Sequence, residues 1–297
     1  MKLPAFLALR CNTLFFLLLF SISLAVQGEG SGYSSGLLFQ IHKPGTEQSY
    51  LFGTMHSEDR RVLELAKPVL DTLERTRRLV LEMRLDPEAM LTSMTAMILS
   101  DGRELQQILG QALYDETRIA AENIGIPEVA LRKFKPWAVA TLLSLPTSNT
   151  GLFLDAMLYQ EAIAGGMEVI GLENAQEQLA VFEGIPEADQ VILLKSTLEH
   201  LDQIPDTLDD LLDAYLARDL KKLVDLSNSL QGESDQRVMQ AFQQAVVTDR
   251  NIRMVQRLIP IIADAPAVIA VGALHLPGDE GLLALLRKQG FTVEKVF

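Results

Sequence analysis

The segment Tyr50-Leu51-Phe52-Gly53-Thr54-Met55-His56 decides the fold prediction for this chain. Its apolar start is typical of a buried strand, the glycine ends that strand, and the histidine follows three residues later. The same order recurs near the other end, where residues 267–271 lead into Gly272-Ala273-Leu274-His275. Each histidine is expected just beyond the carboxyl end of a strand, where open α/β sheets bind ligands. Two such segments, in a chain with only four histidines, indicate one shared site.

Short apolar runs predict six strands, and helical periodicity fills most of the sequence between them. The strands are expected at 37–41, 49–52, 79–83, 167–172, 267–271 and 291–296. The first two read as a hairpin, and the second and third, with the helix between them, as a parallel pair with a right-handed crossover. The sequence therefore predicts an α/β fold whose mixed central sheet is built from N- and C-terminal segments, with large helical insertions.

The first residues resemble an export signal. Lys2 and Arg10 precede an apolar run at 14–24, and small residues follow it, which is typical of a secretory signal peptide over residues 1–27. The run is short for a membrane span, although an uncleaved anchor is the alternative. We therefore expect export to a periplasmic or secreted location, with no stable membrane insertion after cleavage. Residues 28–36 form a Gly/Ser-rich linker, and residues 37–297 form a single domain.

Charge and cysteine content exclude several classes of protein. The net charge is −13, and loss of the two basic residues of the signal peptide takes it to −15, so a nucleic-acid partner is not expected. The single cysteine, Cys11, lies within the signal peptide. The mature chain therefore has neither disulfides nor thiol catalysis. HExxH is absent from the sequence, and no GxSxG, phosphate-loop or GxGxxG motif follows a predicted strand.

The candidate chemistry gathers at strand ends. His56 and His275 are candidate metal ligands, and Glu82 and Glu173 stand at the ends of predicted strands as ligand and general base, in an order that the sequence leaves open. Arg250 could stabilise an oxyanion, and Asn251 could orient a ligand. The alternatives are structural: the glutamates as neighbours of helix N-termini, and the arginine in a surface ion pair. The other two histidines, His42 and His200, read as exposed.

A methionine-rich helical stretch stands apart from these candidates. Met90, Leu91, Met94, Met97, Ile98 and Leu99 recur at helical spacing. Such a stripe is ordinarily core, but methionine also suits an adaptable substrate groove.

Three blocks of the sequence resemble the TraB/GumN family, which is related to the TIKI metalloproteases. They are 51–56 (LFGTMH), 169–179 (VIGLENAQEQL) and 271–278 (VGALHLPG), and the resemblance extends over 37–297. Pro136-Trp137, Asp155 and Arg250-Asn251 also resemble family positions, whereas Leu274 replaces a residue that is small in many relatives. The resemblance implies a fold like that of erythromycin-esterase and ChaN-like proteins. In the TIKI branch it implies proteolysis that depends on Mn²⁺ or Co²⁺.

Two functions from different classes follow. The favoured one is an exported metal-dependent hydrolase acting on a peptide or protein, with a divalent ion (Mn, Co or Zn) bound by His56, His275 and Glu173. Glu82, Glu173, Arg250 and Asn251 are then the expected catalytic residues. The alternative is a protein that uses the same cleft to bind a peptide or haem without turnover. We favour the enzyme because capture does not require paired acids beside paired histidines.

Overall fold

The computed structural model describes residues 33–146, 148, 150–229 and 236–297. The predicted signal peptide and most of the predicted linker lie outside these residues. At the start of the described chain, the Tyr33 hydroxyl donates to the Val293 carbonyl at 2.8 Å, and the Tyr33 ring meets Phe39 edge-on. The last residues of the predicted linker therefore pack on the domain.

A six-stranded mixed sheet is formed by segments from both ends of the chain, as the sequence predicts. Its strands are β1 (Leu38–His42), β2 (Ser49–Thr54), β3 (Arg78–Met83), β4 (Glu168–Glu173), β5 (Val268–Gly272) and β6 (Thr292–Lys295). Their spatial order is β4-β3-β5-β2-β1-β6. The β1–β2 hairpin and β1–β6 are antiparallel, whereas β5 pairs in parallel with both β2 and β3.

One pairing differs from the expectation. β2 and β3 run in the same direction, but they are not neighbours, because β5 lies between them. β5 is buried along its whole length, as a central parallel strand should be. A βαβ pattern in sequence predicts direction but not adjacency, since a strand from far along the chain can enter the gap.

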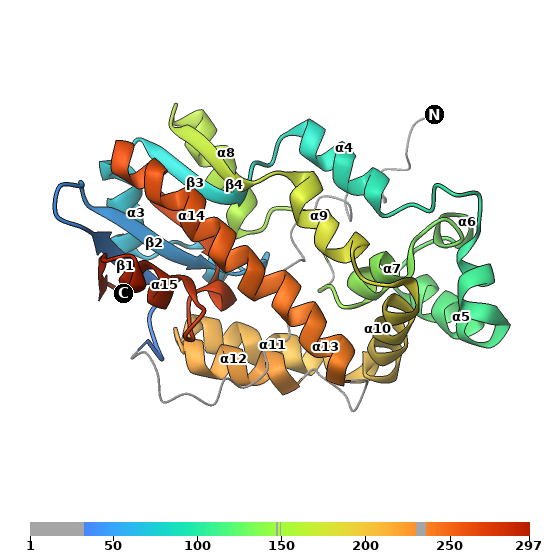
Figure 1. Ribbon diagram of the computed structural model, residues 1–297. Helices are drawn as coiled ribbons and strands as arrows, with labels where there is room; N and C mark the ends of the chain where they lie inside the picture. The colour runs from blue at the N-terminus through green and yellow to red at the C-terminus, as the bar shows by residue number, and fades with distance from the viewer. Residues whose placement is uncertain (1–32, 147, 149, 230–235) are drawn as a thin grey trace.

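Helices cover the sheet and form a second, all-helical part on the right of Figure 1. The early helices are α2 (Arg60–Leu63), α3 (Lys67–Arg75), α4 (Pro87–Ala96), α5 (Leu105–Asn123), α6 (Glu128–Leu131), α7 (Pro136–Leu143) and α8 (Leu154–Ala164). The later ones are α9 (Ala175–Glu183), α10 (Glu187–Glu199), η2 (Leu201–Gln203), α11 (Ile204–Leu216), α12 (Leu220–Ser229), α13 (Gln236–Gln243), η3 (Gln244–Thr248), α14 (Asp249–Asp264), η4 (Ala273–His275) and α15 (Leu282–Lys288). In Figure 1, α14 crosses in front of the sheet.

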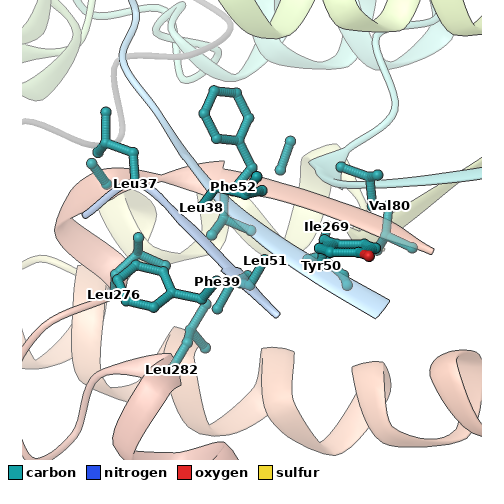
Figure 2. Close-up of a cluster of buried hydrophobic side chains, with 14 of the residues drawn as sticks. Leu37, Leu38, Phe39, Tyr50, Leu51, Phe52, Val80, Ile269, Leu276 and Leu282 are labelled. Carbon is teal, nitrogen blue, oxygen red and sulfur yellow. The ribbon is translucent and has the colours of Figure 1, made fainter. Parts of the chain in front are cut away.

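The hydrophobic core has two parts. Figure 2 shows the first, where Leu38, Phe39, Leu51 and Ile269 of the sheet pack with Leu276 and Leu282 from the C-terminal segment. The second lies among the helices around Trp137, which stacks on Phe182 with ring centroids 4.8 Å apart. No helix within the described part of the chain has the length and apolar character that a membrane span requires.

Candidate active site

The two glycine–histidine segments meet at one edge of the sheet. β2 and β5 are paired so that Gly53 lies opposite Val271 and Thr54 opposite Gly272. A β-carbon on Gly53 would come within 2.7 Å of the Leu276 side chain and 3.2 Å of the Ala273 backbone. The glycine is therefore needed because the second segment passes directly over the first. Tyr215 of α11 fixes the same turn, since its hydroxyl donates to the Gly53 carbonyl at 2.9 Å.

His275 is fully buried in η4, immediately after β5. Its Nδ1 lies 2.6 Å from Oδ1 of Asn251, an amide oxygen that can only accept. The proton is therefore assigned to Nδ1, which leaves a lone pair on Nε2. Nε2 has no hydrogen-bond partner among the described residues, and Oε1 of Glu82 lies 3.8 Å away from it. Burial holds the pKa of His275 well below its usual 6.5, and the nearby Arg250 lowers it further.

His56 follows β2 and contacts a different helix. Its Nδ1 lies 3.4 Å from Oδ2 of Asp155 on α8, and its ring meets Phe153 edge-on at 5.3 Å. Thr54 donates to the other Asp155 oxygen at 2.9 Å. Burial lowers the pKa of His56 to about 4, although the Glu82 charge opposes that shift. Burial and the Glu82 charge raise the pKa of Asp155 to about 7.

The two histidines thus have similar surroundings. Each follows a parallel strand, and each has its Nδ1 beside an oxygen of a buried polar side chain on a helix. The charge of His56 also lowers the pKa of His275, so the imidazoles are close enough to interact electrostatically. Both imidazoles are neutral at neutral pH, which is the form that binds a metal ion.

Arg250 links the two predicted glutamates from the first turn of α14. It is the largest fully buried side chain among the described residues. Its Nη2 donates to Oε2 of Glu82 at 2.6 Å, and its Nε donates to Oε2 of Glu173 at 2.8 Å. Burial opposes its charge, but the two carboxylates outweigh that effect and raise its pKa. Arg250 is therefore buried, and the alternative prediction of a surface ion pair is wrong for it.

Glu82 and Glu173 differ in which of their carboxylate oxygens are already bound by arginines. Both oxygens of Glu173 accept from arginines, because Arg253 donates to Oε1 at 2.8 and 3.1 Å. Glu82 is bound by Arg250 through Oε2, and its Oε1 accepts from the Gly272 amide at 2.8 Å on the side nearest His275. The expected role of Glu173 as a metal ligand stays a prediction, and it would require one arginine contact to be given up.

Arg250 and Asn251 owe their position to an irregular helix. The sequence predicts one continuous helix over 234–258, but the structure has a π-helical segment, η3, between α13 and α14. Such segments are common at functional sites because the extra residue rotates the side chains that follow. The amide of Asn251 is fixed as well, since its Nδ2 donates to the Glu280 carbonyl at 2.8 Å.

Three contributors to the site are absent from the sequence-based set: Thr54, Gln178 and Arg253. Gln178 of α9 donates weakly to Glu82 at 3.4 Å. Asp155 was recognisable, because a lone acid on an apolar helix is costly unless it is paired. The other three carry no such signal, since polar residues at strand ends and on helices are ordinary.

Among the described residues, no group of three or more His, Cys, Asp or Glu side chains is arranged to hold a metal ion. The donor chemistry nevertheless fits one in part. Nε2 of His275 is a buried nitrogen with its lone pair free, and the His56 imidazole and Glu82 Oε1 are donors in its surroundings. Second contacts that fix the other ring nitrogen, as Asn251 does here, are usual for metal-binding histidines.

An α/β sheet with buried imidazoles and carboxylates at the carboxyl ends of its parallel strands has the arrangement of a candidate ligand-binding or catalytic site. The comparison with known families is more specific. The model of the TraB/PrgY/gumN family matches residues 37–295, and the chain belongs to that family.

Two curated relatives are distantly similar. A "Metalloprotease TIKI homolog" of Nematostella vectensis is 27% identical over 166 residues, which cover 48% of this chain and 35% of the relative. "Metalloprotease TIKI1" of Danio rerio is 23% identical over 298 residues, covering 83% of this chain and 60% of the relative. The chain thus spans at most 60% of the length of these relatives. No solved structure matches the chain significantly.

Proposed function

We propose that this chain is an exported, metal-dependent peptidase whose active site is the cluster around His275, His56 and Glu82. The observation that carries the proposal is Nε2 of His275, a buried nitrogen with an assigned lone pair and no hydrogen-bond partner among the described residues. Leaving such a group unsatisfied costs free energy, so its persistence at a strand end favours a ligand. The metalloprotease names of the relatives support the same chemistry.

In this proposal His275 and His56 hold a divalent ion, with Glu82 beside them. The ion supplies a Lewis acid that lowers the pKa of a bound water. Glu82 would take the proton of the attacking water through Oε1 and return it to the leaving amine, while Arg250, 2.6 Å from Oε2, restrains rotation of the carboxylate. Asn251 and Asp155 orient the two imidazoles. Glu173 and Arg253 hold Arg250 in place.

This arrangement assigns Arg250 to positioning. Its Nε and Nη2 already donate to carboxylates, and Nη1 lies 3.4 Å from the Val246 carbonyl. An oxyanion role, which the sequence also allows, would require one of these donors to turn toward the substrate. Export rests on the character of residues 1–27, which lie outside the described residues.

The test measures bound metal and peptide cleavage together. The purified chain, His56→Ala and His275→Ala are analysed by elemental mass spectrometry, and each is assayed on a peptide library after chelation and return of Mn²⁺, Co²⁺ or Zn²⁺. His200→Ala is the matched control, because His200 ends α10 and its Nδ1 contacts the Ser196 carbonyl, away from the cluster. We expect metal and cleavage to be lost in the first two variants and kept in the control.

Retention of both metal and cleavage in the two variants would refute the proposal. The binding alternative predicts a different result: a new visible absorbance band on haem titration that both substitutions abolish, without any metal-dependent cleavage.

A further inference from the structure

A pocket of about 570 Å³ opens beside the cluster, at the carboxyl ends of β3 and β4. Met83 and Glu173 line it at the ends of those strands, together with residues at the starts of α4 and α9. These two helices contact each other, and both continue from those strands (Figure 1). Glu173 belongs to both sites, since its carboxylate binds Arg250 and its residue lines the pocket. The pocket is therefore separated from the cluster by a single side chain.

The charges of the lining decide which ligand the pocket suits. It contains four carboxylates and two guanidinium groups: Asp86, Glu88, Glu173 and Glu177, with Arg84 and Arg257. Arg257 makes two bonds to Glu177, at 2.6 and 2.8 Å, and Arg84 lies 3.5 Å from Asp86. Glu173 is neutralised from behind by Arg250 and Arg253. Glu88 remains, and it forms no ion pair among the described residues, so the pocket has an unbalanced negative charge.

The N-termini of α4 and α9 do not make the pocket attract anions. Helix N-termini attract anions only while their amides are unsatisfied. Here Asp86 caps α4 by accepting from the Ala89 amide at 3.0 Å. Asn174 caps α9 by accepting from the Glu177 amide at 2.9 Å, and the Glu177 carboxylate accepts from the Asn174 amide in return. Both ends are therefore closed by groups of the protein, and a cation is favoured over an anion.

The position of the pocket sets its distance from the cluster. His275 follows β5, and the pocket lies over β3 and β4, which are the next two strands in the sheet. Neighbouring strands are about 4.8 Å apart, so the two sites are separated by roughly 7–10 Å. An extended peptide advances about 3.3 Å per residue, so this distance corresponds to about two to three residues.

We propose that this pocket is the subsite for a lysine or arginine side chain of an extended peptide substrate, about two to three residues from the bond that is cut. This inference rests on the proposed peptidase function. The cationic head reaches Glu88, and its aliphatic stem lies on Met83 and Ala89, as long basic side chains do when they cross an apolar surface.

The first arm of the test measures cleavage of matched peptides. One series has lysine, norleucine or glutamate at each of the four positions on either side of the cut, and the ratio of kcat/KM for lysine over norleucine is taken for the chain and for Glu88→Gln. Glu74→Gln is the control, because Glu74 is an exposed glutamate of α3 outside the pocket lining. We expect a lysine preference at one position two or three residues from the cut, falling about three- to fivefold in Glu88→Gln and unchanged in the control.

The second arm measures binding without turnover. Fluorescence anisotropy with EDTA present compares labelled lysine and norleucine peptides on the unaltered chain and on Glu88→Gln. Selective binding that Glu88→Gln weakens supports the subsite even if no peptide is cleaved, in which case only the proposed peptidase function fails. Cleavage without any lysine preference, a preference that survives Glu88→Gln, or tighter binding of the glutamate peptide would overturn the subsite and leave the peptidase function standing.

Discussion

Replacement of Arg250 by methionine removes the cation that binds both glutamates at the centre of the candidate site. Methionine is unbranched and uncharged and keeps the aliphatic start of the arginine side chain, so the change removes the ion pairs while filling most of the packed volume. Glu173 would keep its bonds to Arg253. Glu82 would keep the Gly272 amide at 2.8 Å and the weak Gln178 contact at 3.4 Å, but no cationic partner. The variant therefore leaves one carboxylate, Glu82, buried and uncompensated.

The expected cost follows from that uncompensated charge. Removing one partner of a buried ion pair destabilises a protein by about 3–5 kcal/mol. Domains are typically stable by about 5–15 kcal/mol, so Arg250→Met should lose a large part of the total. Arg60→Met is the matched control, because the side chains of Arg60 and Glu64 are 91% and 72% exposed and lie 3.6 Å apart. An exposed pair of this kind contributes about 0–1 kcal/mol.

The assay is urea unfolding at pH 7, followed by circular dichroism, for the unaltered chain, both single variants and the double variant Glu82→Gln/Arg250→Met. The double variant removes the stranded carboxylate, so it should recover at least about 1 kcal/mol relative to Arg250→Met. It also keeps the experiment informative if the single variant does not fold. The reasoning is refuted if Arg250→Met costs no more than Arg60→Met, or if the double variant is no more stable than Arg250→Met.

Three further results are expected. Asn251→Ala should weaken metal binding about 10- to 100-fold in titration calorimetry, because Asn251 no longer fixes the proton on Nδ1 of His275. An unchanged affinity would contradict the orienting role of Asn251. Gly53→Ala should destabilise the chain by about 1–3 kcal/mol in thermal unfolding, because its new methyl group would meet Leu276 at 2.7 Å, and a neutral result would mean that the segment shifts freely. Hydrogen bonds from Arg257 lower the pKa of Glu177 from its usual 4.5 to about 2. The unaltered chain should therefore exceed Glu177→Gln in stability by about 0.5–1 kcal/mol above pH 4.5, and this difference should shrink as the pH falls toward 2; a difference independent of pH would exclude the ionic contribution.

The sheet was predictable from sequence because its strands are short apolar runs with clear ends. All six expected strands are present, with boundaries within two residues, and the segments ending at His56 and His275 meet as the repeated glycine–histidine spacing predicts. The position of β5 between β2 and β3 was not predictable, since periodicity gives the direction of a strand but not its neighbours.

The candidate site was predictable in its residue types but not in its pairing. Strand-end position identifies Glu82 and Glu173 as candidates, but their bonds to Arg250 depend on the rotation of α14. That rotation follows from the π-helical segment before it, for which the sequence gives no signal. In the methionine-rich stretch, Met97 is buried in the second core and Met90 packs against it half-buried, whereas Leu91 and Ile98 are exposed, so the core interpretation holds for part of the stretch.

The insertion of β5 at the middle of the sheet also dictates an order of events during synthesis. More than 200 residues separate the end of β2 from the start of β5, and at about 5–20 residues per second a ribosome needs roughly 10–40 seconds to make them. From the synthesis of β3 until that of β5, both β2 and β3 have open edges toward the gap, and one imidazole of the pair does not yet exist. The candidate site is therefore incomplete in the nascent chain, and the unpaired strand edges are the surface that a chaperone would have to shield.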